Sequence, residues 1–358
     1  MNPEFWRGKR VLLTGHTGFK GSWLSLWLQD LGADVYGYSI DVPTSPSLYE
    51  TAAVRDGMTS TTGDVRDLDS LTAFMKSARP EVVIHLAAQS LVRRSYADPA
   101  ETYGTNVLGT VNVLEAVRKV GQVRVVIIVT SDKCYANQER EQGYREDEPM
   151  GGYDPYSSSK GCAELVTSAY TNSFFNPASF DEHGTAVASV RAGNVIGGGD
   201  WAEDRLIPDV VAALRTGAVP AVRNPDAVRP WQFVLDPLNG YLMLAESLWN
   251  DGPNFAGAWN FGPDDGDTQK VGSVVAELSQ QWGGNGGWDR NRGDHPHEAN
   301  FLKLDSSKAR TALSWSPKLP LGTALAWIAD WYKVFDDKRE ARDVTLAQIH
   351  RFQQLAAG

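Results

Sequence analysis

Apolar and polar positions along the first half of the chain alternate between two periods. Short apolar runs of strand length stand at 10–14, 33–40, 81–87, 123–130 and 185–190. Between them, segments with apolar residues at helical spacing occupy 22–31, 100–117 and 156–175. Residues 123–130 form a continuous run rich in β-branched side chains, which is typical of a strand buried on both faces. This alternation predicts a parallel sheet covered by helices on both faces.

The pattern changes after about Asn194, where glycine and proline become frequent and the apolar runs become shorter. We therefore expect an α/β fold with two lobes. A doubly wound parallel sheet is predicted over 1–190, joined by about 228–260. A smaller C-terminal α/β lobe that binds the substrate is predicted over most of 191–358.

Composition excludes several classes of function. The longest apolar runs are far shorter than a membrane helix needs, and the first residues lack the apolar core of a signal peptide, so we expect a cytoplasmic protein with no membrane partner. The two cysteines, Cys134 and Cys162, cannot form a zinc cage, and no cluster has metal-ligand spacing. The net charge of −10 argues against nucleic acid but not against a phosphate ligand.

Three glycines follow the first predicted strand and open the first predicted helix. They are Gly15, Gly18 and Gly21, spaced as G-x-x-G-x-x-G. Such a turn brings the backbone close to a pyrophosphate and presents the positive end of a helix to it. The spacing and its context predict a Rossmann-type site for a dinucleotide.

An acidic residue selects the type of dinucleotide. Asp41 lies just after the second predicted strand, where a carboxylate accepts hydrogen bonds from the adenosine ribose and repels a 2′-phosphate. No arginine stands beside it, so the sequence favours NAD over NADP. The alternative is a solvated turn aspartate before Pro43. Asp64 and Val65, after the next short strand, are expected near the adenine.

A tyrosine and a lysine stand four residues apart in the segment 156–175. Tyr156 and Lys160 would therefore share one face of a helix. An ammonium close to a phenol lowers the pKa of the phenol, which could then take a proton from an alcohol while the nicotinamide takes the hydride. Ser131, at the end of the 123–130 strand, could hydrogen-bond the same alcohol. The alternative, a surface Tyr/Lys pair, loses weight beside the glycine turn.

These motifs together resemble the extended short-chain dehydrogenase/reductase family, over nearly the whole chain. The matching segments are Gly15-His-Thr-Gly18-Phe-Lys-Gly21, His85-Leu-Ala-Ala-Gln89, Asn106, Thr130-Ser-Asp132, Asp154-Pro-Tyr156-Ser-Ser-Ser-Lys160 and Arg191-Ala-Gly-Asn194-Val-Ile-Gly197. The resemblance implies a tightly held NAD and a reactive pair at Tyr156 and Lys160. It also implies that these two residues contact NAD together with Thr17, Phe19, Lys20, Leu86, Ala87, Ala88, Gln89, Asn106, Val129 and Arg191.

The residues after Ser131 narrow the reaction. In the nucleotide-sugar 4,6-dehydratases of this family an acid occupies the position of Asp132, and most members have a glutamate next to it, where this chain has Lys133. The form Ser-Asp-Lys-Cys-Tyr resembles the branch that acts on CDP-D-glucose. Asp132 is then the candidate acid for the departing 6-hydroxyl, and Lys133 the candidate base at carbon 5.

A lysine is a base only when it is neutral, so this assignment needs a lowered pKa. The alternative is that Lys133 orients the substrate while another group takes the proton. A third possibility is a polar strand end with a surface ion pair.

Several residues are candidates for holding the nucleotide-sugar. Arg229 stands where relatives contact the diphosphate, Arg205 lies in a segment that resembles the nucleotide pocket of the family, and Asn194 is expected at the diphosphate or sugar. Gln89 and Ser90 are expected near the glucose. For Arg205 a solvated role is equally compatible with the sequence.

Other functions remain open at this point. The chain could be a dTDP- or GDP-linked 4,6-dehydratase or a 4-epimerase of the same family, or an NAD-binding sensor without catalysis. The family also implies a homodimer, and possibly a tetramer, through a four-helix bundle. Apolar residues compatible with that contact, or equally with the core, are Val107, Val111, Leu114, Leu165, Val166 and Ala169.

Overall fold

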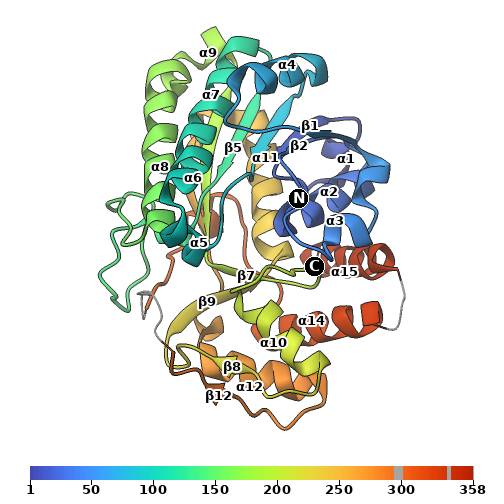
Figure 1. Ribbon diagram of the computed structural model, residues 1–358. Helices are drawn as coiled ribbons and strands as arrows, with labels where there is room; N and C mark the ends of the chain where they lie inside the picture. Colours follow the sequence, from blue (N-terminus) through green and yellow to red (C-terminus); the bar gives the residue numbers. More distant parts are fainter. Residues whose placement is uncertain (294–300, 337–339, 358) are drawn as a thin grey trace.

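The computed structural model describes residues 1–293, 301–336 and 340–357. Its centre is a seven-stranded sheet in the order β10-β6-β5-β4-β1-β2-β3, and every neighbouring pair is parallel. The strands are β1 (Arg10–Thr14), β2 (Asp34–Ser39), β3 (Thr59–Thr62), β4 (Val82–His85), β5 (Val125–Val129), β6 (Ala186–Ala192) and β10 (Gly257–Phe261). The predicted doubly wound α/β fold of Rossmann type is therefore confirmed (Figure 1).

Helices cover both faces of this sheet. One face carries α2 (Phe19–Asp30) and α11 (Leu235–Phe255), and the other carries α4 (Leu68–Ala78), α7 (Gly109–Val120) and α8 (Pro155–Phe174). Successive strand residues point to opposite faces. Thus Val83 and Val126 pack in the cluster with α4, α7 and α8, whereas Ile84 and Ile127 pack in the cluster with α2 and α11.

The predicted helix 100–117 exists but is not regular. It consists of α6 (Pro99–Tyr103), one wide π-helical turn at Gly104–Leu108, and α7. The widened turn contains Asn106, whose amide pairs with the backbone of Gln89. The spacing of apolar residues does not report such a tertiary hydrogen bond or the wider turn that accompanies it. The sequence therefore predicted a regular helix.

The second lobe is built from short strands and several helices, as expected. Its strands are β7 (Asn194–Ile196), β9 (Val228–Phe233) and β11 (Thr268–Lys270) in one sheet, and β8 (Ala221–Val222) and β12 (Asp289–Arg290) in another. Its helices are α10 (Leu206–Arg215), α12 (Val271–Trp282), α13 (Ser307–Ala312), α14 (Leu321–Asp336) and α15 (Ala341–Ala357). The remaining short helices are α1 (Pro3–Trp6), α3 (Leu48–Thr51), α5 (Val92–Ala97) and α9 (Phe180–His183).

The two lobes are interleaved along the chain. α11 packs on β5 and β6, and β10 pairs with β6, so the chain returns to the first sheet after the second lobe has begun. At the other end, α15 packs against α2 and α3. Both observations support our proposed division at about residue 190 with a returning segment, although the return extends to Phe261. None of the helices within the described ranges is both long and apolar enough to cross a membrane.

Candidate active site

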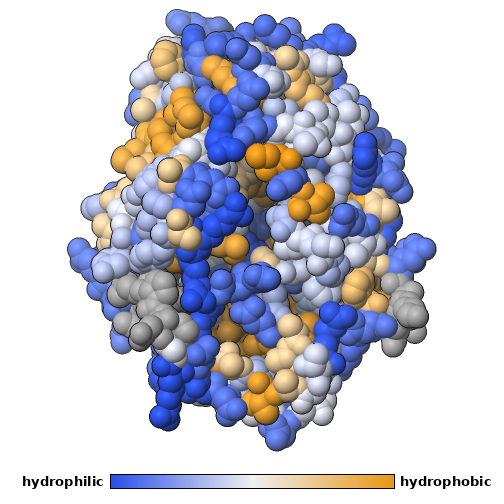
Figure 2. All heavy atoms as spheres, in the orientation of Figure 1, coloured by the Kyte–Doolittle hydropathy of each residue, from blue (hydrophilic) through white to orange (hydrophobic). Residues whose placement is uncertain are grey.

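A large cavity lies between the lobes, at the carboxyl ends of β1, β4, β5 and β6. Its volume of about 1290 Å³ exceeds that of a site for one small ligand, so it has room for a dinucleotide and a second substrate. Parallel sheets bind ligands at this edge, where the strand order reverses between β1 and β4. Figure 2 shows the surface hollowed near the middle of this face.

The glycine turn between β1 and α2 forms one wall of the cavity. Gly15 has a φ of +73°, and a Cβ there would lie 2.6 Å from the backbone nitrogen of Ala87. A Cβ on Gly21 would lie 2.2 Å from the carbonyl oxygen of Gly15, whereas one on Gly18 would meet only that oxygen, at 3.4 Å. No side chain caps the first amides of α2. The turn therefore leaves backbone donors and space for a pyrophosphate, and it fits a dinucleotide.

The predicted ribose and adenine contacts line the same cavity. The Asp41 side chain is exposed there. The backbone carbonyl oxygen of Asp41 accepts a hydrogen bond of 2.6 Å from the Thr17 hydroxyl. Asp64 is paired with Arg66 at 2.6 Å, so this carboxylate already has a cation partner. Other predicted cofactor contacts that line the cavity are Phe19, Lys20, Val65, Leu86, Ala87, Ala88 and Val129.

Asn106 was predicted to contact the cofactor, and here the structure differs. Its side chain is buried and is occupied by the backbone of Gln89 on one side and the Ser159 hydroxyl on the other. Gln89 lines the cavity, but its amide is bonded to the backbone of Leu91 and to Thr102. Both residues therefore hold the loop after β4 in place rather than offering free groups to a ligand.

Arg191 is likewise not at the cavity. Its guanidinium is 3% exposed and donates to Glu164 at 2.8 Å and to the Tyr135 hydroxyl at 2.6 Å. Glu164 also accepts hydrogen bonds from Thr130 and Ser189. The predicted cofactor contact by Arg191 is therefore wrong for its side chain. Glu164 was not among the predicted site residues, although its place one helical turn after Lys160 puts it on the same face of α8.

Tyr156 and Lys160 both lie on the first turns of α8 and line the cavity, but they are not coupled as predicted. The Lys160 ammonium donates to the carbonyl oxygen of Val129 at 3.2 Å. Burial lowers the pKa of Lys160 to about 8, and the Glu164 carboxylate opposes that shift. Burial raises the pKa of Tyr156, and this rise is opposed by the positive charge of Lys133, by a hydrogen bond with Ser131 and by the positive charge of Arg205. The expected lowering of the phenol pKa by Lys160 is thus not what the structure shows.

Asp132 and Lys133 form an ion pair at the end of β5. The Asp132 carboxylate is fully buried, and its Oδ1 accepts from Ser131 at 2.9 Å and from Lys133 at 3.3 Å. Lys133 and Ser131 line the cavity. Burial lowers the pKa of the Lys133 ammonium, but Asp132 and Tyr156 outweigh this effect and the pKa is raised overall. Lys133 is therefore protonated at rest, which contradicts its assignment as a base that starts neutral.

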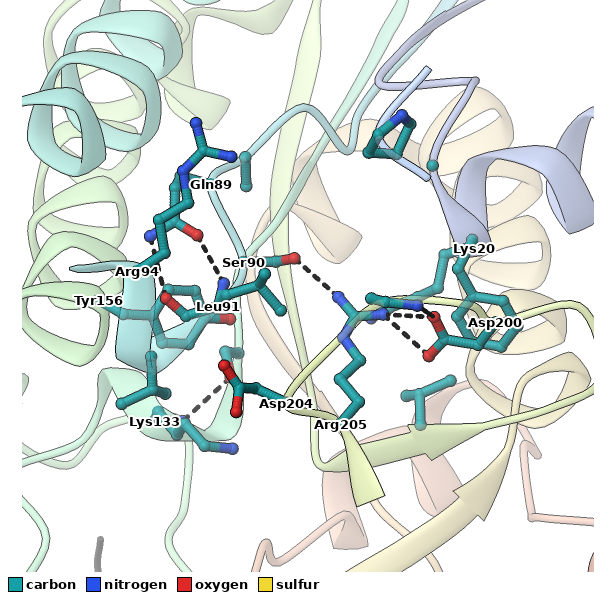
Figure 3. A pocket seen from close by; sticks show the side chains of 18 of the residues that line it. Lys20, Gln89, Ser90, Leu91, Arg94, Lys133, Tyr156, Asp200, Asp204 and Arg205 are labelled. Atoms are coloured by element: carbon teal, nitrogen blue, oxygen red, sulfur yellow. Dashed lines mark hydrogen bonds and ion pairs between the residues drawn. The ribbon is translucent and has the colours of Figure 1, made fainter. Parts of the chain in front are cut away.

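The residues predicted to bind the substrate also line the cavity. The Arg205 guanidinium reaches across it, bonded to Asp200 at 3.0 Å and to the Ser90 hydroxyl at 2.7 Å (Figure 3). Arg229 lines the cavity and acts electrostatically on Lys133. Asn194 lines it too, and its buried Oδ1 has no hydrogen-bond partner. The unpartnered Asn194 oxygen suits a ligand that donates a hydrogen bond, and the two arginines that line the same cavity suit a ligand with negative charge.

Comparison with known proteins identifies the family of this chain. The family described as GDP-mannose 4,6 dehydratase matches residues 12–326. A CDP-glucose 4,6-dehydratase from Salmonella typhimurium is 54% identical over 335 residues, which is 94% of this chain and 93% of that enzyme. The chain belongs to the extended short-chain dehydrogenase/reductase family.

Solved structures of an epimerase and of a dehydratase have the same fold as this chain. An epimerase from Methanothermobacter thermautotrophicus superposes with a TM-score of 0.80 at 22% identity, covering 93% of this chain and 95% of the epimerase. A dTDP-glucose 4,6-dehydratase from Bacillus anthracis in complex with NAD gives 0.75 at 21% identity, covering 90% and 96%. Epimerases and dehydratases thus share one fold, so the reaction has to be argued from the residues of the site.

Proposed function

We propose that this chain is an NAD-dependent hydro-lyase that converts CDP-D-glucose to CDP-4-dehydro-6-deoxy-D-glucose. The observation that carries the proposal is the Asp132–Lys133 ion pair beside Tyr156. The pair supplies the acid–base chemistry that a dehydration needs and a plain alcohol oxidation does not. The relative named as a CDP-glucose 4,6-dehydratase supports the choice of substrate.

The first step is oxidation at carbon 4 of the sugar. Tyr156 takes the proton of the 4-hydroxyl as a phenolate, which burial disfavours and the positive charges of Lys133 and Arg205 favour. Ser131 holds the same oxygen. Lys160 keeps a positive charge near the cofactor side of the cavity, stabilised by Glu164. Bound in this cavity, NAD would supply the hydride acceptor for carbon 4 and, as NADH, the hydride donor for carbon 6, so there would be no net oxidation. The 4-ketone then acidifies the proton on carbon 5.

The second step is loss of water across carbons 5 and 6. Because Lys133 starts protonated, it can donate its proton to the departing 6-hydroxyl. The neutral amine formed in this way takes the proton from carbon 5 in the same elimination. The C5–H and C6–O bonds break, a C5–C6 double bond forms, and Lys133 ends protonated again. Asp132, predicted from the sequence as the acid, has no exposed surface, and in this mechanism it holds Lys133 and Ser131 in place.

The test is incubation of the purified protein with CDP-, dTDP-, GDP- and UDP-D-glucose, followed by mass detection of the loss of water. The proposal predicts turnover of CDP-D-glucose well above the other three. Preference for dTDP- or GDP-glucose would support the proposed dehydratase reaction but contradict the proposed CDP nucleotide. No turnover of any nucleotide-sugar by protein that carries NAD would favour a sensor.

A 4-epimerase is the main competing function within the family. An epimerase would release an isomer of equal mass, so mass detection separates the two. Absorbance in alkali gives a second readout, because 4-keto-6-deoxy sugars develop a chromophore there and epimers do not. The Asp132–Lys133 pair favours the dehydratase, since an epimerase has no hydroxyl to expel.

The proposed assembly is a homodimer through α7 and α8. Apolar side chains are exposed on this side of the molecule, with Leu108 at 48% and Leu165 at 60% (Figure 2). Ala169 is also exposed, but Leu114, which we had grouped with them, is fully buried in the core. The cysteines of the chain, Cys134 and Cys162, are both free thiols, which is compatible with the proposed cytoplasmic location.

A further inference from the structure

Lys20 is a cation in a place that disfavours cations. It is the second residue of α2, between Phe19 and Gly21 of the glycine turn, and its side chain lines the cavity. The first turn of a helix carries partial positive charge, so an ammonium there is repelled. Figure 3 shows Lys20 across the cavity from Tyr156 and Lys133, near Asp200 and Arg205.

Charged groups from several different elements shift the pKa of Lys20. Burial lowers its pKa to about 7, and the positive charges of Lys160 on α8, Arg205 before α10 and Lys133 after β5 act in the same direction. Asp132 opposes them, but its carboxylate is already bonded to Lys133. The carboxylate of Asp200 is bonded to Arg205.

Lys20 differs in this respect from the other cations of the cavity. Lys133 is paired with Asp132, Arg205 with Asp200, and Lys160 donates to a carbonyl oxygen. Within the part of the chain that the structure describes, the Lys20 ammonium has neither a hydrogen bond nor an ion pair. A half-buried ammonium that lines a cavity among other cations is stabilised by an anion bonded directly to it, and the described residues place none there.

We propose that the Lys20 ammonium binds the diphosphate of the nucleotide-sugar, an inference that rests on the function proposed above. Two diphosphates could enter this cavity, since NAD carries one as well. The uncapped amides of α2 suit the diphosphate of the cofactor. The charges that act on Lys20 are those of Lys160 on the cofactor side and of Arg205, Asp132 and Lys133. The Lys20 side chain lies near Arg205, which is bonded to Asp200 and Ser90 on the substrate side (Figure 3). Lys20 therefore extends from the cofactor-binding turn to contact the substrate.

The lowered pKa gives this contact a distinct signature. With a pKa of about 7, Lys20 is mostly neutral at pH 8 in the free protein. A bound diphosphate favours the charged form and raises that pKa, so binding at pH 8 takes up a proton. A residue with a purely structural role would not change the proton balance of binding.

The experiment is calorimetric titration with CDP and with cytidine, at pH 8 in buffers of different ionisation enthalpy, on protein without NAD and on NAD-loaded protein. Lys20→Met is expected to weaken CDP binding by about 10- to 100-fold, as for loss of a charge-assisted hydrogen bond, and to leave cytidine binding unchanged. Lys20→Arg is expected to keep the affinity but lose the proton uptake, because arginine stays charged. Lys76→Met, at an exposed lysine of α4, is the matched control and should behave as wild type.

Three results would overturn the proposal. They are equal weakening of CDP and cytidine by Lys20→Met, unchanged CDP binding with weaker NAD binding, and proton uptake that persists in Lys20→Arg. The nucleotide is checked separately by titrating wild type with dTDP, GDP and UDP. If wild type prefers one of these, the proposed substrate fails and the Lys20 variants are measured with the preferred diphosphate. If wild type binds none of the four, both proposals fail.

Discussion

At the scale of single residues, the phenol of Tyr156 is affected by cations from other elements. Burial raises its pKa, and the positive charges of Lys133 and Arg205 oppose that rise. The Tyr156–Lys160 spacing predicted two side chains at one site, and both line the cavity. The effect of Lys133 on the phenol was not predictable from that spacing, because it depends on how the end of β5 packs against α8.

Lys133 therefore gives the sharpest residue-scale prediction. Lys133→Ala is expected to lose dehydration by a factor of at least about 10², the usual contribution of general acid–base catalysis, while still binding CDP-D-glucose. Lys133→Arg keeps the positive charge but cannot become the neutral base, so it should be as inactive as the alanine variant. Loss of water is measured by mass, and binding by calorimetry.

The arginine variant decides between the two roles of Lys133. Dehydration by Lys133→Arg at close to the wild-type rate would mean that Lys133 only orients the substrate. In that case the proton on carbon 5 is taken by another group. Near-wild-type product formation by Lys133→Ala would remove Lys133 from the mechanism altogether.

At the scale of elements, the strand ends that carry the site are joined by a buried polar network. Glu164 on α8 accepts from Thr130 after β5 and from Ser189 and Arg191 on β6. The strands themselves followed from the apolar runs. The network did not, because the partners are far apart in the sequence and meet only when α8 packs over the sheet. For the same reason Arg191 looked like a ligand contact.

Glu164→Gln is expected to destabilise the protein by about 3 kcal/mol, because it leaves the buried Arg191 without its counter-charge. It should also shift the alkaline limb of the activity profile to lower pH, since Glu164 holds up the pKa of Lys160. Denaturant unfolding and the pH dependence of kcat measure the two effects. Glu4→Gln, whose partner Arg7 is exposed, is the control and should cost under about 1 kcal/mol. A Glu164→Gln protein of wild-type stability would contradict the role of this network.

At the scale of the whole molecule, α11 connects the lobes through Asp236. This carboxylate is buried at the start of α11 and accepts a hydrogen bond of 2.6 Å from the backbone of Lys318, while its second oxygen has no partner. Burial raises its pKa to about 7. Because this value lies above that of an unfolded aspartate, the folded protein binds the extra proton, and stability is lost as pH rises toward 7.

Asp236→Asn removes this titration. Relative to wild type, the free energy of unfolding of the variant is expected to rise between about pH 4 and pH 7, from the pKa of an unfolded aspartate to that of folded Asp236, and to level off above pH 7. Urea unfolding at several pH values measures the difference, with Asp69→Asn at an exposed site of α4 as the control. Parallel stability profiles for wild type and Asp236→Asn would contradict the prediction.

The proposed dimer is tested at the same scale. Leu165→Glu places a charge at the exposed apolar face of α8, where desolvation on association would be costly. We expect the variant to elute as a monomer in light-scattering chromatography and the wild type as a dimer. Val219→Glu, at an exposed apolar residue of the second lobe, should leave the dimer intact. A wild type that is already monomeric would overturn the proposed assembly.

The place of β10 at the edge of the first sheet has a consequence for biosynthesis. Strand β6 has its outer edge covered only by β10, and β10 is made after most of the second lobe's strands have left the ribosome. Until residue 261 emerges, the nascent chain carries an open, apolar strand edge, which is the feature that promotes aggregation. Folding of the first lobe therefore depends on segments of the chain that are synthesised late. Chains truncated after β6 should be captured by chaperones instead of folding as separate cofactor-binding domains.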